Sequence, residues 1–96
     1  MVVWRVFEHD DPRRRALAAA PPEELRRQLE RLFEEPPSPL RDGTIAFVYL
    51  NLARRLEGDE AERCFVAGYS YARTSRDPQA RPLAERVREE FPAWRR

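Results

Sequence analysis

The lone histidine lies in the stretch Glu8-His9-Asp10-Asp11, where imidazole and carboxylate groups that could bind a metal ion are adjacent. A metal site needs three or four ligands that converge in a fixed geometry, and contiguous residues just before a helix seldom converge without ligands from elsewhere. Asp11 is better explained as the cap of a helix that starts at Pro12. We therefore predict a solvated turn at this stretch, with no metal and no other cofactor.

The other side chains that could catalyse a reaction do not form a recognisable site. Adjacent carboxylates on a helix point a quarter-turn or more apart, so such pairs do not face one substrate. Cys64 is expected on a buried helix face as a small apolar residue, and 3 glycines are too few for a phosphate-binding loop. We predict a non-enzymatic protein, and an enzyme subunit whose site a partner completes is a further hypothesis. The adjacent carboxylates are Glu23-Glu24, Glu34-Glu35, Asp59-Glu60 and Glu89-Glu90.

Arginine supplies all 18 basic residues, against 17 acidic residues and a net charge of +1. Arginine beside exposed tyrosine can bind phosphates and stack on bases, so nucleic-acid binding or regulation through an Arg/Tyr surface is the alternative function. Nucleic-acid-binding domains usually carry a clear basic excess, which this chain lacks. Surface ion pairs, such as Glu30 with Arg26 or Arg27, account for most of the arginines. The arginine groups are Arg13-Arg14-Arg15, Arg54-Arg55, and Arg73 with Arg76 after Tyr69 and Tyr71.

The stretch Thr44–Thr74 contains two apolar helical patterns that meet at Gly58-Asp59, which predicts a helical hairpin. Gly58 is expected to take the left-handed conformation that ends the first helix, and Asp59 to cap the second. Gly68 is expected to let another helix approach closely. The first pattern carries Ile45, Val48, Tyr49, Leu52 and Leu56. The second carries Ala61, Cys64, Phe65, Gly68 and either Tyr71 or Ala72, with Val66 and Tyr69 off this stripe.

This hairpin partly resembles a tetratricopeptide repeat. The spacing of Ala61 and Phe65, with the small Gly68 three residues further on, is similar to the second helix of such a repeat. Tyr49 stands where the repeat prefers a small residue, Asp77-Pro78 closes the unit several residues late, and no second copy follows. Such repeats need neighbours to bury their faces. We interpret the likeness as convergent hairpin packing, which keeps binding of a peptide in a groove among the hypotheses.

Helices are also predicted on both sides of the hairpin. Asp10-Asp11-Pro12 starts a short helix with Leu17 as its large apolar anchor, and residues 22–35 form the clearest amphipathic helix. Asp77-Pro78 starts the last helix, whose regular part Pro82 could delay. The apolar stripes are Leu25, Leu29, Leu32 and Phe33 in residues 22–35, and Leu83, Val87 and Phe91 in the last helix.

Residues 36–43 are predicted to form a stiff, proline-rich connector. Leu40 could plug the core, and either Asp42 or Thr44 could cap the central helix. The prolines could also be a ligand for an SH3-like or WW-like groove, although a rigid linker is the simpler interpretation.

The N-terminal arm, residues 1–9, is rich in β-branched and aromatic side chains, which is typical of a strand. No other segment predicts a strand to pair with it. The arm would therefore pair with a second copy or another protein, or else lie extended with Trp4 and Phe7 on the helices. Trp94 either folds back onto the core or serves as a binding anchor.

A chain of 96 residues is long enough for one domain, residues 1–96. We predict a mainly α fold, a small bundle of four to five helices around a central antiparallel helix hairpin, with a short N-terminal β-like arm. The single cysteine suits a reducing cytoplasm, and neither a signal peptide nor a run of about 18 apolar residues for a membrane span is expected. The preference for arginine over lysine fits a thermophilic source or a GC-rich genome.

We expect a small protein that binds another protein or itself, for instance as a homodimer. The unpaired arm and several aromatic side chains are more than a domain of this size can bury alone. The candidate partner-binding residues are Val2, Trp4, Val6, Phe7, Tyr69, Tyr71, Arg73, Arg76 and Trp94.

Overall fold

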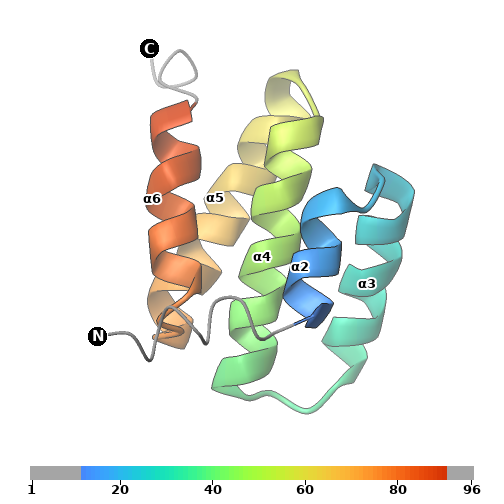
Figure 1. The fold of residues 1–96 in the computed structure, drawn as a ribbon, viewed down its shortest axis with the longest axis vertical. Helices are drawn as coiled ribbons and strands as arrows, with labels where there is room; N and C mark the ends of the chain where they lie inside the picture. Colours follow the sequence, from blue (N-terminus) through green and yellow to red (C-terminus); the bar gives the residue numbers. More distant parts are fainter. Residues whose placement is uncertain (1–11, 91–96) are drawn as a thin grey trace.

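The computed structural model describes residues 12–90, which are mainly helical, as predicted. The arm, Phe91 and Trp94 lie outside the described residues. Between residues 12 and 90 the chain contains no strand. The helices, shown in Figure 1, are α2 (Pro12–Ala19), α3 (Pro22–Glu34), α4 (Pro39–Arg55), α5 (Gly58–Ser75) and α6 (Ala80–Glu90).

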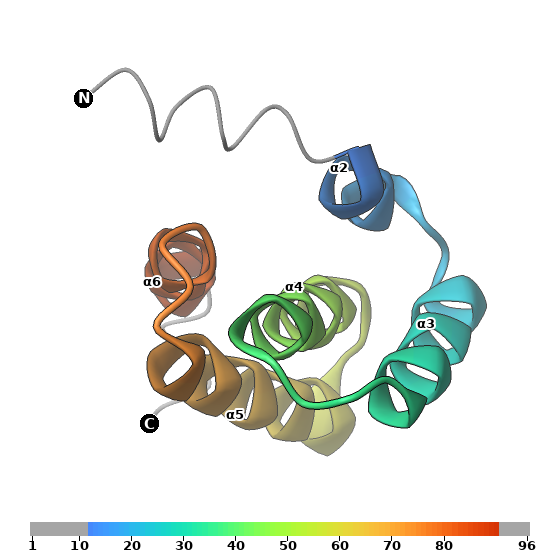
Figure 2. The ribbon, with the colours of Figure 1, turned by 90° about the horizontal axis from the view of Figure 1, so that it is seen from below.

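Helix α4 is the element around which the others are arranged. It contacts each of α2, α3, α5 and α6, and its most extensive contact is with α5, which runs in the opposite direction (Figure 1). Figure 2 shows α4 with α5 beneath it and with α6, α2 and α3 around its remaining sides. The apolar side chains of α4 extend over more than one helix face, and they are buried because neighbouring helices cover α4 on several sides.

Two groups of buried side chains form the core on opposite sides of α4. One lies between α4, α5 and α6, and the other between α2, α3 and α4. Phe47 and Tyr71 pack against both groups, so the two groups are continuous around α4. The first contains Ala46, Leu50, Ala72, Ala80, Leu83, Ala84 and Val87, and the second contains Leu17, Leu25, Leu32, Ile45, Val48 and Leu52.

The start of α4 differs from the prediction. The connector ends at Ser38, whose Oγ accepts the backbone N–H of Arg41 at 3.0 Å and caps the helix, so residues 39–43 belong to α4. Pro39 fits the first turn because its missing N–H would have no helical partner there. Leu40 is 63% exposed and does not plug the core. The prediction was wrong because it assigned Pro39 to the linker.

The junction of α4 and α5 contains the left-handed glycine that the sequence predicts. Gly58 has a φ of +66°, but it is also the first residue of α5, so Asp59 lies in the first turn instead of capping it. Gly68 allows close contact with α4, since a Cβ there would lie 2.8 Å from Leu50 Cγ and 3.1 Å from Leu50 N. Its role in helix approach is thus confirmed.

Asp77 starts the last helix, in line with the sequence. Its Oδ1 accepts the backbone N–H groups of Gln79 at 2.9 Å and Ala80 at 3.2 Å. Regular helix begins at Ala80, before Pro82, and Asp77 Oδ1 satisfies the N–H of this first helical residue.

The apolar stripe of α3 is narrower than predicted. Leu25 and Leu32 are fully buried and Leu29 is half-buried, whereas Phe33 is 46% exposed. Phe33 lies near the end of α3, where its ring contacts α5 rather than the core.

Of the helices within residues 12–90, none has the length and apolar character needed to cross a membrane.

Candidate partner-binding face

One side of α5 presents aromatic, aliphatic and basic groups to solvent. Ala61, Gly68 and Ala72 occupy the buried side. Because each residue advances about 100° around a helix, Val66 and Tyr69 point elsewhere, and Val66 is 59% exposed. The residues that we call the α5 face line a shallow depression of about 500 Å³ and are Phe65, Val66, Tyr69, Ser70, Arg73 and Thr74.

Tyr69 is held in position on this face by three neighbours. Its ring centroid lies 5.7 Å from that of Phe65, and its hydroxyl donates to Glu85 Oε2 of α6 at 2.9 Å. The Arg73 guanidinium lies 6.0 Å from the centre of the same ring. Tyr69 and Arg73 also line a second groove of about 280 Å³ between α5 and α6, together with Ala72, Arg81, Ala84 and Glu85. Tyr69 therefore presents a fixed aromatic edge at the boundary of two helices.

Tyr71 lies on a different side of α5 and does not join Tyr69. It stacks on Tyr49 of α4 with ring centroids 6.1 Å apart and an interplanar angle of 18°. The Phe33 ring of α3 lies 6.3 Å away on the same side. Burial, with a smaller effect of Tyr71, raises the pKa of the Tyr49 hydroxyl. These contacts give Tyr71 a packing role between three helices.

The other predicted contact residues divide into two groups. Arg73 and Arg76 are exposed, and Arg76 ends α5 in the left-handed conformation with a φ of 60°. Val2, Trp4, Val6, Phe7 and Trp94 lie outside the described residues. The structure thus brings Tyr69 and Arg73 together, with Arg76 at the end of the same helix.

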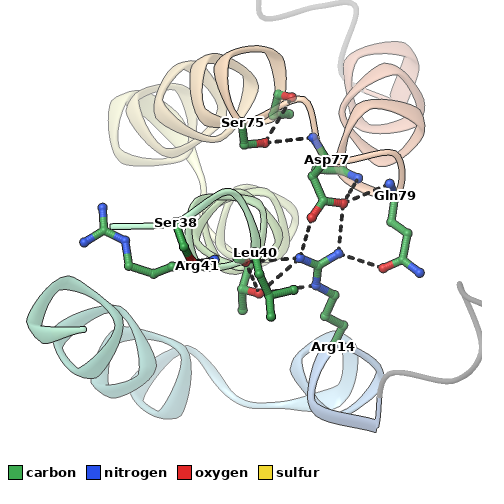
Figure 3. Close-up of polar contacts among 10 residues, drawn as sticks. Arg14, Ser38, Leu40, Arg41, Ser75, Asp77 and Gln79 are labelled. Atoms are coloured by element: carbon green, nitrogen blue, oxygen red, sulfur yellow. Dashed lines mark hydrogen bonds and ion pairs between the residues drawn. The ribbon is translucent and has the colours of Figure 1, made fainter. Parts of the chain in front are cut away.

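Arg14 forms the most extensive polar cluster in the described part of the chain, and sequence reasoning missed it. The side chain is only 4% exposed and extends from α2 to the start of α4 and to the junction of α5 and α6 (Figure 3). Its guanidinium donates to Asp77 Oδ1 at 3.0 Å and Oδ2 at 2.7 Å, to Gln79 Oε1 at 2.7 Å and to Thr44 Oγ1 at 3.1 Å. It also lies 4.7 Å from the centre of the Phe47 ring.

Asp77 is suited to this buried pair because several donors surround its carboxylate. Burial alone would raise its pKa, but the hydrogen bonds and charge of Arg14, with the N–H groups of Gln79 and Ala80, hold the pKa below its usual value. Gly43 leaves the necessary space, since a Cβ at that position would collide with the Asp77 carboxylate. Arg14 is therefore a structural residue and not part of a surface arginine group.

Several further arginines connect helices through exposed groups. Arg26 pairs with Glu60 at 2.7 Å and Arg54 with Glu90 at 2.9 Å, each across two helices. Arg27 pairs with Glu24 at 2.7 Å. Within residues 12–90, the predicted pairing of Arg26 or Arg27 with Glu30 is replaced by these contacts. The prediction was wrong for Arg26 because its partner Glu60 comes from α5, and wrong for Arg27 because its partner on α3 is Glu24 rather than Glu30.

Cys64 is a free cysteine on α5. Cys64 is half-buried rather than buried, and this burial raises the pKa of its thiol, which disfavours the nucleophilic thiolate. From residue 12 to residue 90, no three His, Cys, Asp or Glu side chains are grouped so that they could hold a metal ion. The stretch Glu8-His9-Asp10-Asp11 lies outside the described residues.

Comparison with known proteins adds no relative: no family model matches the chain, and neither a curated protein nor a solved structure shows significant similarity to it.

Proposed function

We propose that this chain is a small non-enzymatic protein-interaction module and that the α5 face is its contact surface. The observation that carries the proposal is the exposed Val66 beside a fixed Tyr69 and an exposed Arg73. Tyrosine and arginine are enriched among the residues that contribute most to protein interfaces, where they cluster near the centre of the buried surface.

The fixed position of Tyr69 favours binding. A side chain that is already held by Phe65, Arg73 and Glu85 loses little rotamer freedom when a partner covers it. Covering Val66 removes exposed apolar surface from water, which is the main favourable term in most protein association. The partner is another protein or a second copy of this chain.

Nucleic-acid binding is the alternative function and is supported by fewer side chains than the sequence suggested. Arg14 is buried, Arg54 pairs with Glu90, and Arg55 donates to backbone carbonyls of α2 and of the residue that follows it. Of the predicted Arg/Tyr surface, this hypothesis retains the exposed Arg73, which lies beside Tyr69, and the exposed Arg76, which directly follows α5. If it holds, DNA or RNA binds at low salt and its affinity falls steeply as salt rises.

The proposed interaction can be tested by placing a photo-reactive amino acid at Val66, with the same group at exposed Glu89 of α6 as the matched control. We expect a discrete cross-linked product of defined mass from position 66, which Tyr69→Ser reduces strongly, and none from position 89. The protein in each product is identified by mass spectrometry. Equal, diffuse labelling from both positions would contradict the proposed face.

A further inference from the structure

Five residues of α5 and its C-cap, Arg76, form a row whose charges are arranged symmetrically. They are spaced alternately three and four residues apart, which is the spacing of helix pairs and keeps the five helical residues on one side of α5, with Arg76 directly after its C-terminal end. The N-terminal end of the row is acidic, the centre is apolar and aromatic, and the C-terminal end is basic. We call this row the α5 stripe; it consists of Asp59, Glu62, Val66, Tyr69, Arg73 and Arg76.

The stripe is accessible to a partner. Tyr69 is half-buried and the other five residues are exposed. Figure 2 shows no other described helix on the side of α5 that lies away from α4. Among residues 12–90, none of the four charged side chains of the stripe forms an ion pair, whereas Arg26, Arg27 and Arg54 do.

We propose that the α5 stripe binds the same stripe of a second copy of the chain, with the two helices antiparallel. This inference rests on the proposed function, because it names the partner of the same surface. In this orientation Asp59 lies opposite Arg76 of the second copy, Glu62 lies opposite Arg73, and Val66 lies opposite Tyr69. Every contact occurs twice, as the two-fold symmetry of a homodimer requires.

The charges select this orientation over the parallel one. A parallel pair in register would place Glu62 against Glu62 and Arg73 against Arg73, and like charges across an interface are strongly unfavourable. The helix dipole of α5 also favours acidic residues at its N-terminal end and basic residues at its C-terminal end. The dipole accounts for the sign of the charge at each end, but it does not require the stripe spacing or an apolar pair at its centre.

A charge-exchange experiment shows whether the charges pair with a second copy or only complement the helix dipole. One variant carries Asp59→Arg and Glu62→Arg, and the other carries Arg73→Glu and Arg76→Glu. Each variant alone repels its own copy, so its apparent dissociation constant should rise about tenfold or more. Mixing the two variants restores opposite charges at every contact, and a heterodimer should form with an affinity close to that of the wild type.

Sedimentation and native mass spectrometry of the wild type, each variant and the mixture measure these states, and circular dichroism shows that each variant is helical. A wild-type chain that stays monomeric at millimolar concentration, or a dimer that the variants leave unchanged, would overturn the inference. So would a mixture without heterodimer. A monomeric wild type whose photo-reactive position 66 labels a different protein would refute the dimer and leave the proposed function standing.

Disulfide trapping provides a second measurement if a charge variant does not fold. In a Cys64→Ser background, chains with Glu62→Cys are mixed with chains with Arg73→Cys. The antiparallel pair places these positions opposite each other, whereas two copies of position 62 are about 16 Å apart along the axis. We expect the mixed disulfide to form faster than either symmetric one. Preferential joining of position 62 to position 62 would overturn the orientation.

Discussion

Arg14 shows how one side chain can connect four elements of a small helical domain. Its guanidinium comes from α2 and binds groups of α4 and of the junction between α5 and α6. A buried charge is tolerated when its partners satisfy it, and every donor direction here meets an oxygen or an aromatic ring. The pair specifies where α2 docks, since Leu17 is the one large apolar residue of that helix.

Replacing Arg14 by Met should destabilise the fold by about 3 kcal/mol, because it leaves the Asp77 carboxylate buried without its cation. Backbone N–H groups still bind Asp77, so the loss should lie at the low end for a broken buried pair. Chemical denaturation measures the effect, and exposed Arg15→Met is the matched control, with an expected change within about 0.5 kcal/mol. Equal effects of the two substitutions would refute the structural role.

Asp77 also predicts how stability depends on pH. Its pKa is lower in the folded chain than in the unfolded one, so the ionised form stabilises the fold above the unfolded pKa of about 3.9. This contribution is lost as pH falls through the folded pKa. The difference in free energy of unfolding between the wild type and Asp77→Asn should therefore shrink below about pH 4. Glu24, whose pKa is also lowered, is present in both proteins and cancels.

A gap between the two proteins that stays constant from pH 7 to pH 2 would contradict this account of Asp77. Urea unfolding followed by circular dichroism at each pH provides the measurement.

At the scale of helices, the contact between α4 and α5 depends on a residue that weakens the helix containing it. Gly68 lowers intrinsic helix stability by about 1 kcal/mol relative to Ala. The space it leaves is filled by Leu50, which is fully buried. The close contact between α4 and α5 at Gly68 therefore offsets the lower helix propensity of glycine.

Gly68→Ala should destabilise the protein by about 1–2 kcal/mol, despite the better helix propensity of Ala, because the new Cβ collides with Leu50. Ser70→Ala, at an exposed position of the same helix, should be neutral or slightly stabilising. Thermal unfolding compares the two. A Gly68→Ala protein that is more stable than the wild type would show that the two helices have room to adjust.

For the whole molecule, the sequence predicted most of the features that depend on residues close together in the chain. Helical class, the left-handed Gly58 and the helix start at Asp77 follow from neighbours in the chain, and a glycine inside a helical pattern indicated the close approach at Gly68. Val66 and Tyr69 were recognisable as lying off the buried stripe of their helix. The helical spacing therefore identified two of the residues of the α5 face.

Features that depend on distant residues could not be predicted in this way. Arg14 is one of three consecutive arginines, and only the folded chain distinguishes the one that meets Asp77, 63 positions later. The same holds for Arg26, whose partner Glu60 lies on another helix. Phe33 fits the apolar spacing of α3, but its exposure depends on where α5 passes.

The two proposals for α5 are linked, because the helix carries the interaction surface and a second copy of the chain occupies that surface. The most direct measurement is an isotope-filtered nuclear Overhauser experiment on a mixture of labelled and unlabelled chains, which detects only contacts between copies. We expect contacts of the Val66 methyl groups with the Tyr69 ring, and of Glu62 with Arg73. Contacts of Glu62 with Glu62, contacts confined to other helices, or no contacts between copies at millimolar concentration would contradict the claim.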